Sequence, residues 1–282
     1  MEIKSYLKRK LIKEKKEKVL IPCLEGHFLE GRCALITGGT SGIGLAIAES
    51  FLKNGSDVVI SARNTERLVG TKEKLVEVCN CDSSRIEILE IDISRVDDAK
   101  KRFFEFSNGF NKNIDIFVNN AGVNGGQVFP DTNEEDYDTI LDTNLKGVYF
   151  FSQEIAQYMI RRSIKGNVLN IVSSSALRPA ISPYIIAKWG ERGLTLGMAK
   201  KYLPYGIIVN GLAPGSALTP MLFKDTDDNM HLDYSPAKRY VASEEIANLA
   251  TVLVSDIGKM IVGDIIYATG GAGVLTYDDM SY

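Results

Sequence analysis

Short apolar runs alternate with segments of helical periodicity along most of the chain. The runs that predict strands are residues 33–37, 57–61, 86–91, 114–118, 168–172, 206–210 and 264–268. The helical pattern covers about 42–55, 65–79, 95–107, 134–162, the segment from Tyr184 to about 203, and 243–254. Strands that alternate with helices at this spacing predict an α/β fold with a doubly wound parallel sheet of about seven strands, helices on both faces and right-handed crossovers.

Residues 1–30 have a different character, because lysine and arginine outnumber the acidic residues there. The segment contains no apolar core of the kind found in secretory signals. Its apolar residues at helical spacing allow a basic amphipathic helix that touches an anionic membrane or a partner. We favour a solvated arm packed loosely on the body. Residues 31–282 contain no linker or repeat and predict a single domain, with residues 217–240 as the substrate lid because they lack periodicity.

Composition narrows the functional classes. The 282 residues, 45% of them hydrophobic, suffice for one sizeable core, and a net charge of -3 gives no global basic field for nucleic acid. Neither the four cysteines nor the two histidines have the spacing of a disulfide framework or of a metal site. No apolar run is long enough to span a bilayer. These features predict a cytoplasmic protein with idle thiols and no metal.

A glycine-rich turn lies between the first strand and the first helix. Its sequence is Thr37-Gly-Gly-Thr-Ser-Gly-Ile-Gly44. Glycines allow a tight turn and a close approach of backbone to phosphate, and the helix N-terminus supplies N–H groups with partial positive charge. A single turn of this kind can also be an ordinary loop.

The second strand ends in Ser61-Ala-Arg-Asn64. A site that prefers NAD usually has a carboxylate there for the ribose 2′-hydroxyl, and this chain has none. Arg63 could instead pair with a 2′-phosphate, so NADP(H) is favoured and NAD(H) remains possible.

Tyr184 and Lys188 are four residues apart, which places both side chains on one face of a helix. A free tyrosine hydroxyl has a pKa of about 10, and a neighbouring ammonium lowers it. A serine that follows the strand 168–172 can reach the same space. Together these groups suit proton transfer to or from an alcohol or carbonyl oxygen. A lone pair of this kind is more often a solvated lysine beside a half-buried tyrosine, so the interpretation depends on the other motifs.

Taken together, the motifs resemble the short-chain dehydrogenase/reductase family in its single-domain, Rossmann-like form, over about residues 31–271. The motifs that carry the resemblance are Thr37-Gly-x-x-x-Gly-x-Gly44, Asn119-Asn-Ala-Gly122, Asn144, a serine after the fifth strand, Tyr184-x-x-x-Lys188, and Pro214-Gly215 with Thr219. The longer sugar-modifying members of the superfamily place their glycines differently and carry a larger C-terminal substrate domain. This chain has neither feature.

The resemblance implies a role for each matching residue. The cofactor-binding residues would be Gly38, Thr40, Ser41, Gly42, Ile43 and Gly44 at the pyrophosphate turn, Asp92 and Ile93 at the adenine, Asn120, Ala121 and Gly122 near the ribose, and Pro214, Gly215, Ala217 and Thr219 at the nicotinamide. Tyr184 would be the acid-base residue. Lys188 would lower its pKa and bind the nicotinamide ribose. Ser173, or else Ser174 or Ser175, would bind the substrate oxygen, and Asn144 would position a water that passes protons to Lys188.

The expected function is hydride transfer between a nicotinamide cofactor, NADPH by preference, and a carbonyl or secondary alcohol. An NAD-linked alcohol dehydrogenase is the alternative among enzymes, and a non-catalytic nucleotide-binding scaffold is the alternative outside them. The resemblance also implies a homodimer or homotetramer that pairs through the helix of Tyr184 and its neighbour.

Overall fold

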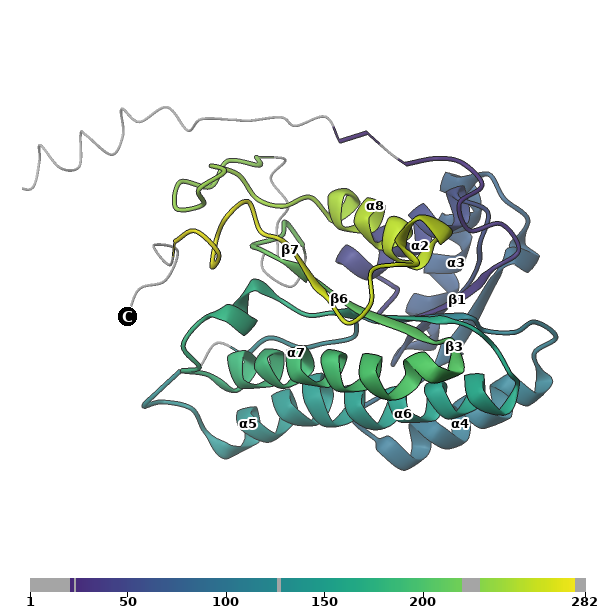
Figure 1. Cartoon of the computed structure of the whole chain (residues 1–282), viewed down its shortest axis with the longest axis horizontal. Helices are drawn as coiled ribbons and strands as arrows, with labels where there is room; N and C mark the ends of the chain where they lie inside the picture. The colour runs from purple at the N-terminus through teal and green to yellow at the C-terminus, as the bar shows by residue number, and fades with distance from the viewer. Residues whose placement is uncertain (1–20, 23, 126–127, 220–228, 277–282) are drawn as a thin grey trace, which may run out of the picture.

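A computed structural model describes residues 21–22, 24–125, 128–219 and 229–276. Its centre is one sheet of seven parallel strands in the order β3-β2-β1-β4-β5-β6-β7 (Figure 1). The strands are β1 (Cys33–Thr37), β2 (Asp57–Ala62), β3 (Ile86–Glu90), β4 (Ile116–Asn119), β5 (Asn167–Ile171), β6 (Ile208–Pro214) and β7 (Ile265–Ala268). The predicted doubly wound α/β fold is therefore confirmed.

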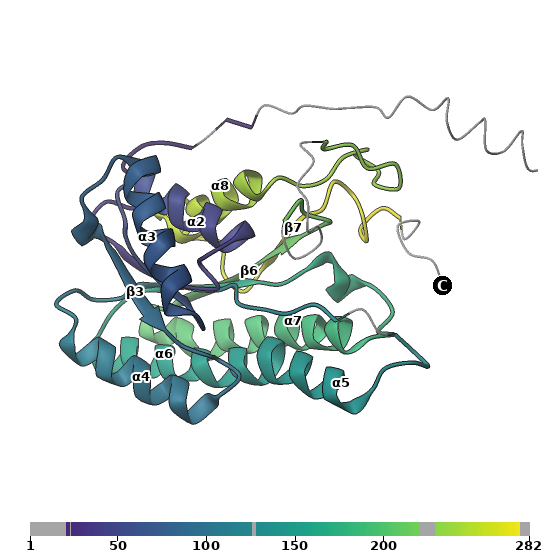
Figure 2. The ribbon, with the colours of Figure 1, turned by 180° about the vertical axis from the view of Figure 1, so that it is seen from behind.

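Helices cover both faces of the sheet (Figures 1 and 2). One face carries α2 (Gly42–Lys53), α3 (Thr65–Cys79) and α8 (Ser243–Val254); the other carries α4 (Val96–Gly109), α5 (Glu134–Leu141), α6 (Val148–Arg161) and α7 (Pro183–Tyr202). Side chains alternate across each strand, so Ala34 and Ile36 enter one core and Cys33 and Leu35 the other. Both faces are buried, which explains why the strands read as continuous apolar runs.

Two predicted helices have the expected bounds, and their ends show why. Asn64 caps α3, since its side chain accepts a hydrogen bond from the N–H of Arg67, and Asn80 ends it in the left-handed conformation. At the start of α8, the carboxylate of Glu245 accepts from the N–H of Ala242. Most other predicted bounds differ from the observed ones by one or two residues.

Two predicted elements are wrong in detail. The continuous helix 134–162 is divided into α5, a π-helical segment η2 (Asp142–Gly147), and α6. The strand predicted at 206–210 is β6, which runs from Ile208 to Pro214. Gly206 has φ 76 and ends the preceding turn, so the strand cannot begin there. It continues further because Gly211–Pro214 pair with β7.

The predicted basic arm lies outside the described residues apart from its last part, and so do residues 220–228 of the predicted lid. Within the described part of the chain, no helix is long and apolar enough to cross a membrane. The same residues contain no cluster of three or more His, Cys, Asp or Glu side chains able to hold a metal ion.

Candidate active site

A cavity lies at the carboxyl ends of the strands, where the strand order reverses between β1 and β4. In open α/β sheets this crevice is the usual ligand site. The cavity holds about 650 Å³ and is lined from the β1–α2 turn and from the ends of β2, β4, β5 and β6. Of the predicted cofactor and catalytic residues, only Gly44 and Asn144 are not in this lining. The predicted residues that line the cavity are Gly38, Thr40, Ser41, Gly42, Ile43, Arg63, Asp92, Ile93, Asn120, Ala121, Gly122, Ser173, Tyr184, Lys188, Pro214, Gly215, Ala217 and Thr219.

The glycine turn has the shape of an anion cradle. Gly38 and Gly42 have φ values of 66 and 52, in the left-handed region that side chains disfavour. A Cβ atom on Gly38 would lie 3.0 Å from the Cα of Ala121. Gly44 lies beneath the turn, where a Cβ atom would meet the side chain of Asn120 and the carbonyl oxygen of Gly38. The N-terminus of α2 therefore borders the cavity through a turn whose tightest positions are glycines, which fits a pyrophosphate.

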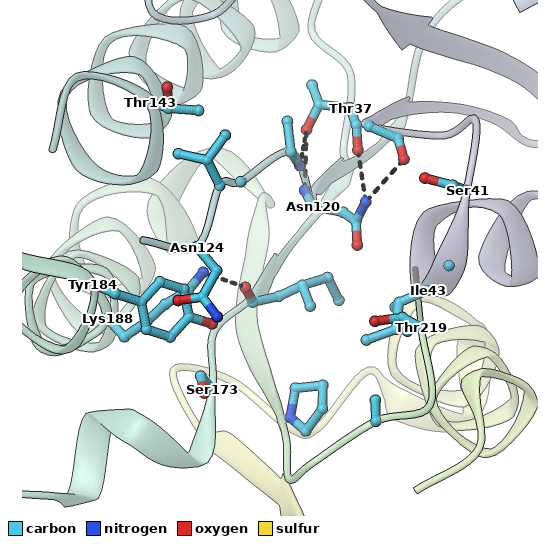
Figure 3. A pocket seen from close by; sticks show the side chains of 18 of the residues that line it. Thr37, Ser41, Ile43, Asn120, Asn124, Thr143, Ser173, Tyr184, Lys188 and Thr219 are labelled. Atoms are coloured by element: carbon cyan, nitrogen blue, oxygen red, sulfur yellow. Dashed lines mark hydrogen bonds between the residues drawn. The ribbon is translucent and has the colours of Figure 1, made fainter. Parts of the chain in front are cut away.

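Asn120 ties the turn to the end of β4 (Figure 3). Its side-chain nitrogen donates to the carbonyl oxygens of Thr37 and Gly38 at 3.0 and 3.2 Å. The hydroxyl oxygen of Thr37 in turn accepts from the backbone N–H groups of Asn120 and Ala121 at 3.0 and 3.1 Å. These bonds fix the two strand ends that border the expected ribose site. Thr37 was not among the predicted site residues, although it begins the glycine motif.

The end of the cavity beyond β2 is bordered by two guanidinium groups. Arg63 and Arg67 are both exposed and both line the cavity. Asp92 is the only carboxylate among the described lining residues, and its oxygen accepts from the backbone and hydroxyl of Ser94 at 3.1 and 2.7 Å. The sequence analysis missed Arg67. This residue is four positions after Arg63, in the first turn of α3, and that closeness to Arg63 could have indicated a place at the same end of the cavity.

Tyr184, Lys188 and Ser173 meet at the other end of the cavity (Figure 3). Lys188 is buried at 6% exposure, and its Nζ lies 5.7 Å from the centre of the Tyr184 ring. The helix α7 places both residues because Ser182 caps it, accepting from the N–H of Ile185, and Pro183 begins it. Ser173 follows β5 and accepts a hydrogen bond from the N–H of Ser175 at 3.1 Å.

Lys188 has a partner that the sequence analysis missed. Its Nζ donates to both carboxylate oxygens of Glu191 at 2.7 and 2.9 Å, and to the carbonyl oxygen of Ile171 at 3.1 Å. These bonds use the three N–H donors of an ammonium. A contact of Lys188 with a nicotinamide ribose, as the resemblance implies, would therefore require one of them to be exchanged. The only sequence signal for Glu191 is its position three residues after Lys188.

Asn144 does not face the cavity. It is fully buried in the π-helical segment η2, where its side chain donates to the carbonyl oxygen of Val123 at 2.7 Å and accepts from its N–H at 2.8 Å. The side-chain amide thus ties the interrupted helix to the loop after β4. Its expected part in positioning a water stays a prediction.

Ser173, Ser174 and Ser175 all line the cavity, but their surroundings differ. Ser174 is buried, and the Nη1 of Arg178 lies 2.6 Å from its hydroxyl oxygen. Ser173 is half-buried, and Figure 3 shows it in the same space as Tyr184. Arg178 is itself a lining residue with 6% exposure, and the sequence analysis missed it.

Comparisons with known proteins show the family of the chain. The family model for short chain dehydrogenases matches residues 32–230. Gluconate 5-dehydrogenase of Gluconobacter oxydans (strain 621H) is 31% identical over 252 residues, covering 87% of this chain and 96% of the relative. The 3-oxoacyl-(acyl-carrier-protein) reductase FabG of Staphylococcus epidermidis (strain ATCC 12228 / FDA PCI 1200) is 32% identical over 248 residues, covering 85% and 98%.

Solved structures show the same similarity. A gluconate 5-dehydrogenase from Burkholderia cenocepacia J2315, in complex with NADP and tartrate, has a TM-score of 0.78 and 31% identity, with 87% of this chain and 96% of that chain covered. A 3-ketoacyl-(acyl-carrier-protein) reductase from Brucella melitensis, complexed with NADH, has a TM-score of 0.75 and 29% identity, with 86% and 98% covered. With a family model that spans most of the domain and relatives above 30% identity along nearly their whole length, the chain belongs to the short-chain dehydrogenase/reductase family.

Proposed function

We propose that this protein is a nicotinamide-dependent oxidoreductase in which Tyr184 is the acid-base residue for a carbonyl or secondary alcohol substrate. The observation that carries the proposal is that one cavity joins the glycine turn to the Tyr184, Lys188 and Ser173 side chains. The turn fits a pyrophosphate, and the remote end of the cavity offers the groups needed to move a proton. A non-catalytic scaffold would need the turn and not the Tyr–Lys pair.

The chemistry divides between cofactor and protein. When bound, the nicotinamide supplies or accepts the hydride. In the reducing direction, the hydroxyl of Tyr184 gives its proton to the developing alkoxide, and Ser173 donates a hydrogen bond to the same oxygen. In the oxidising direction, the Tyr184 phenolate takes the proton of the alcohol. The ammonium of Lys188 lies beside the Tyr184 ring, 5.7 Å from its centre.

We further propose that the cofactor is NADP(H) by preference. Arg63 and Arg67 border the ribose end of the cavity, and a 2′-phosphate would find charge-assisted donors there. Asp92 is the single carboxylate among the described lining residues, so the two guanidinium groups outnumber it. The similar structures include complexes with both cofactors, NADP in one and NADH in another. An NAD-linked alcohol dehydrogenase is therefore the second candidate.

For the substrate, we propose a hydroxy acid or the corresponding keto acid. Arg178 supports this, because its buried guanidinium lines the cavity in the same region as Ser173 and Tyr184. The Gluconobacter oxydans relative acts on gluconate by name, and the Burkholderia cenocepacia structure contains tartrate. A substrate screen should begin with sugar acids and small hydroxy acids, with neutral sugars and 3-oxoacyl thioesters as comparators.

The exposed apolar side chains on the α6–α7 layer support a homodimer or homotetramer. Tyr149 on α6 and Trp189 and Leu196 on α7 are 50%, 44% and 49% exposed. Sedimentation of the wild type and of Leu196→Asp tests this pairing. We expect a dimer or tetramer for the first and dissociation for the second, and a monomeric wild type would contradict it.

The proposed cofactor is tested by calorimetric titration of the purified chain with NADPH and, separately, with NADH. We expect both to bind, NADPH more tightly. Tighter binding of NADH would reject the preference for NADP(H) and favour the alcohol dehydrogenase. Binding of neither would reject the oxidoreductase and leave the scaffold.

A further inference from the structure

Glu191 is a buried carboxylate that the proposed reaction does not use. It is 3% exposed and lies on α7, one turn after Lys188. A buried carboxylate is costly unless it is paired. Its two oxygens accept from the Nζ of Lys188, which is itself 6% exposed. The site residue Lys188 thus carries its own counter-ion inside the protein.

The surroundings hold this pair in one geometry. The third donor of Lys188 binds the carbonyl oxygen of Ile171, the last residue of β5. Thr195 donates to the backbone carbonyl oxygen of Glu191 at 2.8 Å and accepts from the side chain of Asn170 at 2.8 Å, which links the helix again to β5. Both contacts come from the strand that leads to Ser173. The carboxylate therefore fixes Nζ relative to the strand as well as to Tyr184.

We propose that Glu191 is a positioning residue of the active site: its carboxylate keeps Lys188 charged in a buried place and holds its Nζ between Ile171 and Tyr184. The proposed effect on catalysis rests on the roles proposed above for Tyr184 and Lys188. The proposed effect on Lys188 itself does not depend on those roles, because it concerns only the charge and the position of the Lys188 side chain.

The charges around the pair agree with this role. Burial by itself would lower the pKa of Lys188, and the charge of Glu191, with a contribution from Tyr184, more than reverses this, so the pKa lies above its ordinary value. Burial raises the pKa of Glu191, against the opposing charge of Lys188. Tyr184 and Glu191, both on α7, are the titratable groups that act on Lys188 among the described residues. The groups of β5 that face the pair, the carbonyl of Ile171 and the amide of Asn170, are neutral.

The inference predicts what removal of the carboxylate does. In Glu191→Gln, burial acts on Lys188 without the charge of Glu191, the larger of the two that oppose it, so the pKa of Lys188 should fall below the ordinary 10.5. The ammonium is then lost as the pH rises, and with it the positive charge beside the Tyr184 ring. Glu191→Asp keeps a carboxylate with a shorter reach and should recover part of the effect.

The direct test follows the ¹³Cε chemical shift of Lys188 with pH in the protein without cofactor, with the signal assigned through Lys188→Arg. We expect a midpoint above 10.5 in the wild type. The midpoint should lie below 10.5 in Glu191→Gln and between the two in Glu191→Asp. Equal midpoints in the three proteins would overturn the inference. If Glu191→Gln does not fold, the midpoints of Glu191→Asp and the wild type are compared instead. A lower midpoint in Glu191→Asp would support the inference, and equal midpoints would overturn it.

The second readout is the pH profile of kcat/KM for alcohol oxidation. We expect the wild-type profile to rise to a plateau and the Glu191→Gln profile to fall again on the alkaline side, where Lys188 loses its proton. Loss of activity by the same factor at every pH would mean a merely structural role and overturn the inference. The activity of Tyr184→Phe in alcohol oxidation is measured in the same experiment. If that variant stays active, the proposed function fails, while the chemical-shift titration still decides the role of Glu191.

Discussion

Gly44 and Asn120 are packed so closely that no other residue type fits at position 44. A Cβ atom there would meet the side-chain nitrogen of Asn120, which donates to the carbonyl oxygens of Thr37 and Gly38. We predict that Gly44→Ala pushes Asn120 away, distorts the phosphate turn and costs about 1–3 kcal/mol of stability. Calorimetry should show at least a tenfold weaker binding of NADPH, about 1.4 kcal/mol.

Gly70 provides the matched control for this substitution. It lies within α3, is exposed, and a Cβ atom there would meet nothing within 4 Å. Gly70→Ala should leave cofactor binding unchanged and stabilise the protein by about 0.5–1 kcal/mol, because alanine favours the helix. Equal effects of the two substitutions on NADPH binding would contradict the close packing at Gly44.

Arg63 should distinguish the two cofactors. We predict that Arg63→Ala weakens binding of NADPH by about 1.5–3 kcal/mol, the worth of a hydrogen bond to a charged group, and leaves binding of NADH nearly unchanged. Arg102→Ala is the control, since Arg102 is an exposed arginine that pairs with Asp98 and Glu90 away from the cavity. Equal losses for both cofactors would assign Arg63 a general structural role.

Cys33 should make stability fall in alkaline solution. Burial, assisted by the charges of Asp57 and Asp115, raises the pKa of its thiol from 9.0 to about 12. Above pH 9 the unfolded chain therefore loses a proton that the folded chain keeps, and this favours unfolding by up to about 1.4 kcal/mol per pH unit.

The measurement is urea unfolding of the wild type and of Cys33→Ala at several pH values. Removal of the thiol costs packing at every pH, so only the change with pH is informative. Between pH 8.5 and 10, the stability advantage of the wild type should shrink by about 1 kcal/mol. A difference that stays constant over this range would show that the thiol does not titrate as the buried site requires.

Arg178 should determine the substrate class. We predict that Arg178→Gln raises KM for a hydroxy acid at least tenfold, about 1.4 kcal/mol, and has a smaller effect on a neutral alcohol of similar size. Steady-state kinetics with both substrates measures the ratio. If the hydroxy acid is no better a substrate than the neutral alcohol even for the wild type, the proposed substrate class is wrong.

The sequence predicted the fold well where local signals and burial agree. The strands are buried on both faces and read as apolar runs, and α3 has the expected bounds because Asn64 caps it. The π-helical interruption at Asp142–Gly147 was missed, because the helical pattern continues across it and its stabilising contact, Asn144 with Val123, is made in the folded protein.

Those residues of the candidate site that belong to a sequence motif could be predicted. Tyr184, Lys188 and the glycine turn have characteristic spacings, and the structure brings them to one cavity. Arg178 and Glu191 were missed for a physical reason. Charged residues in a helix or loop usually face solvent, and these two are buried only because a partner or a cavity lies beside them in the folded chain.

The central claim is that Tyr184 transfers the proton at a nicotinamide site. Its most direct test is Tyr184→Phe, measured for turnover on an active substrate and for NADPH binding by calorimetry. The account predicts a loss of about 10²- to 10⁴-fold in kcat, with cofactor affinity nearly unchanged, because only the hydroxyl is removed. Turnover close to that of the wild type, with NADPH still bound, would contradict the account and place the acid-base group elsewhere.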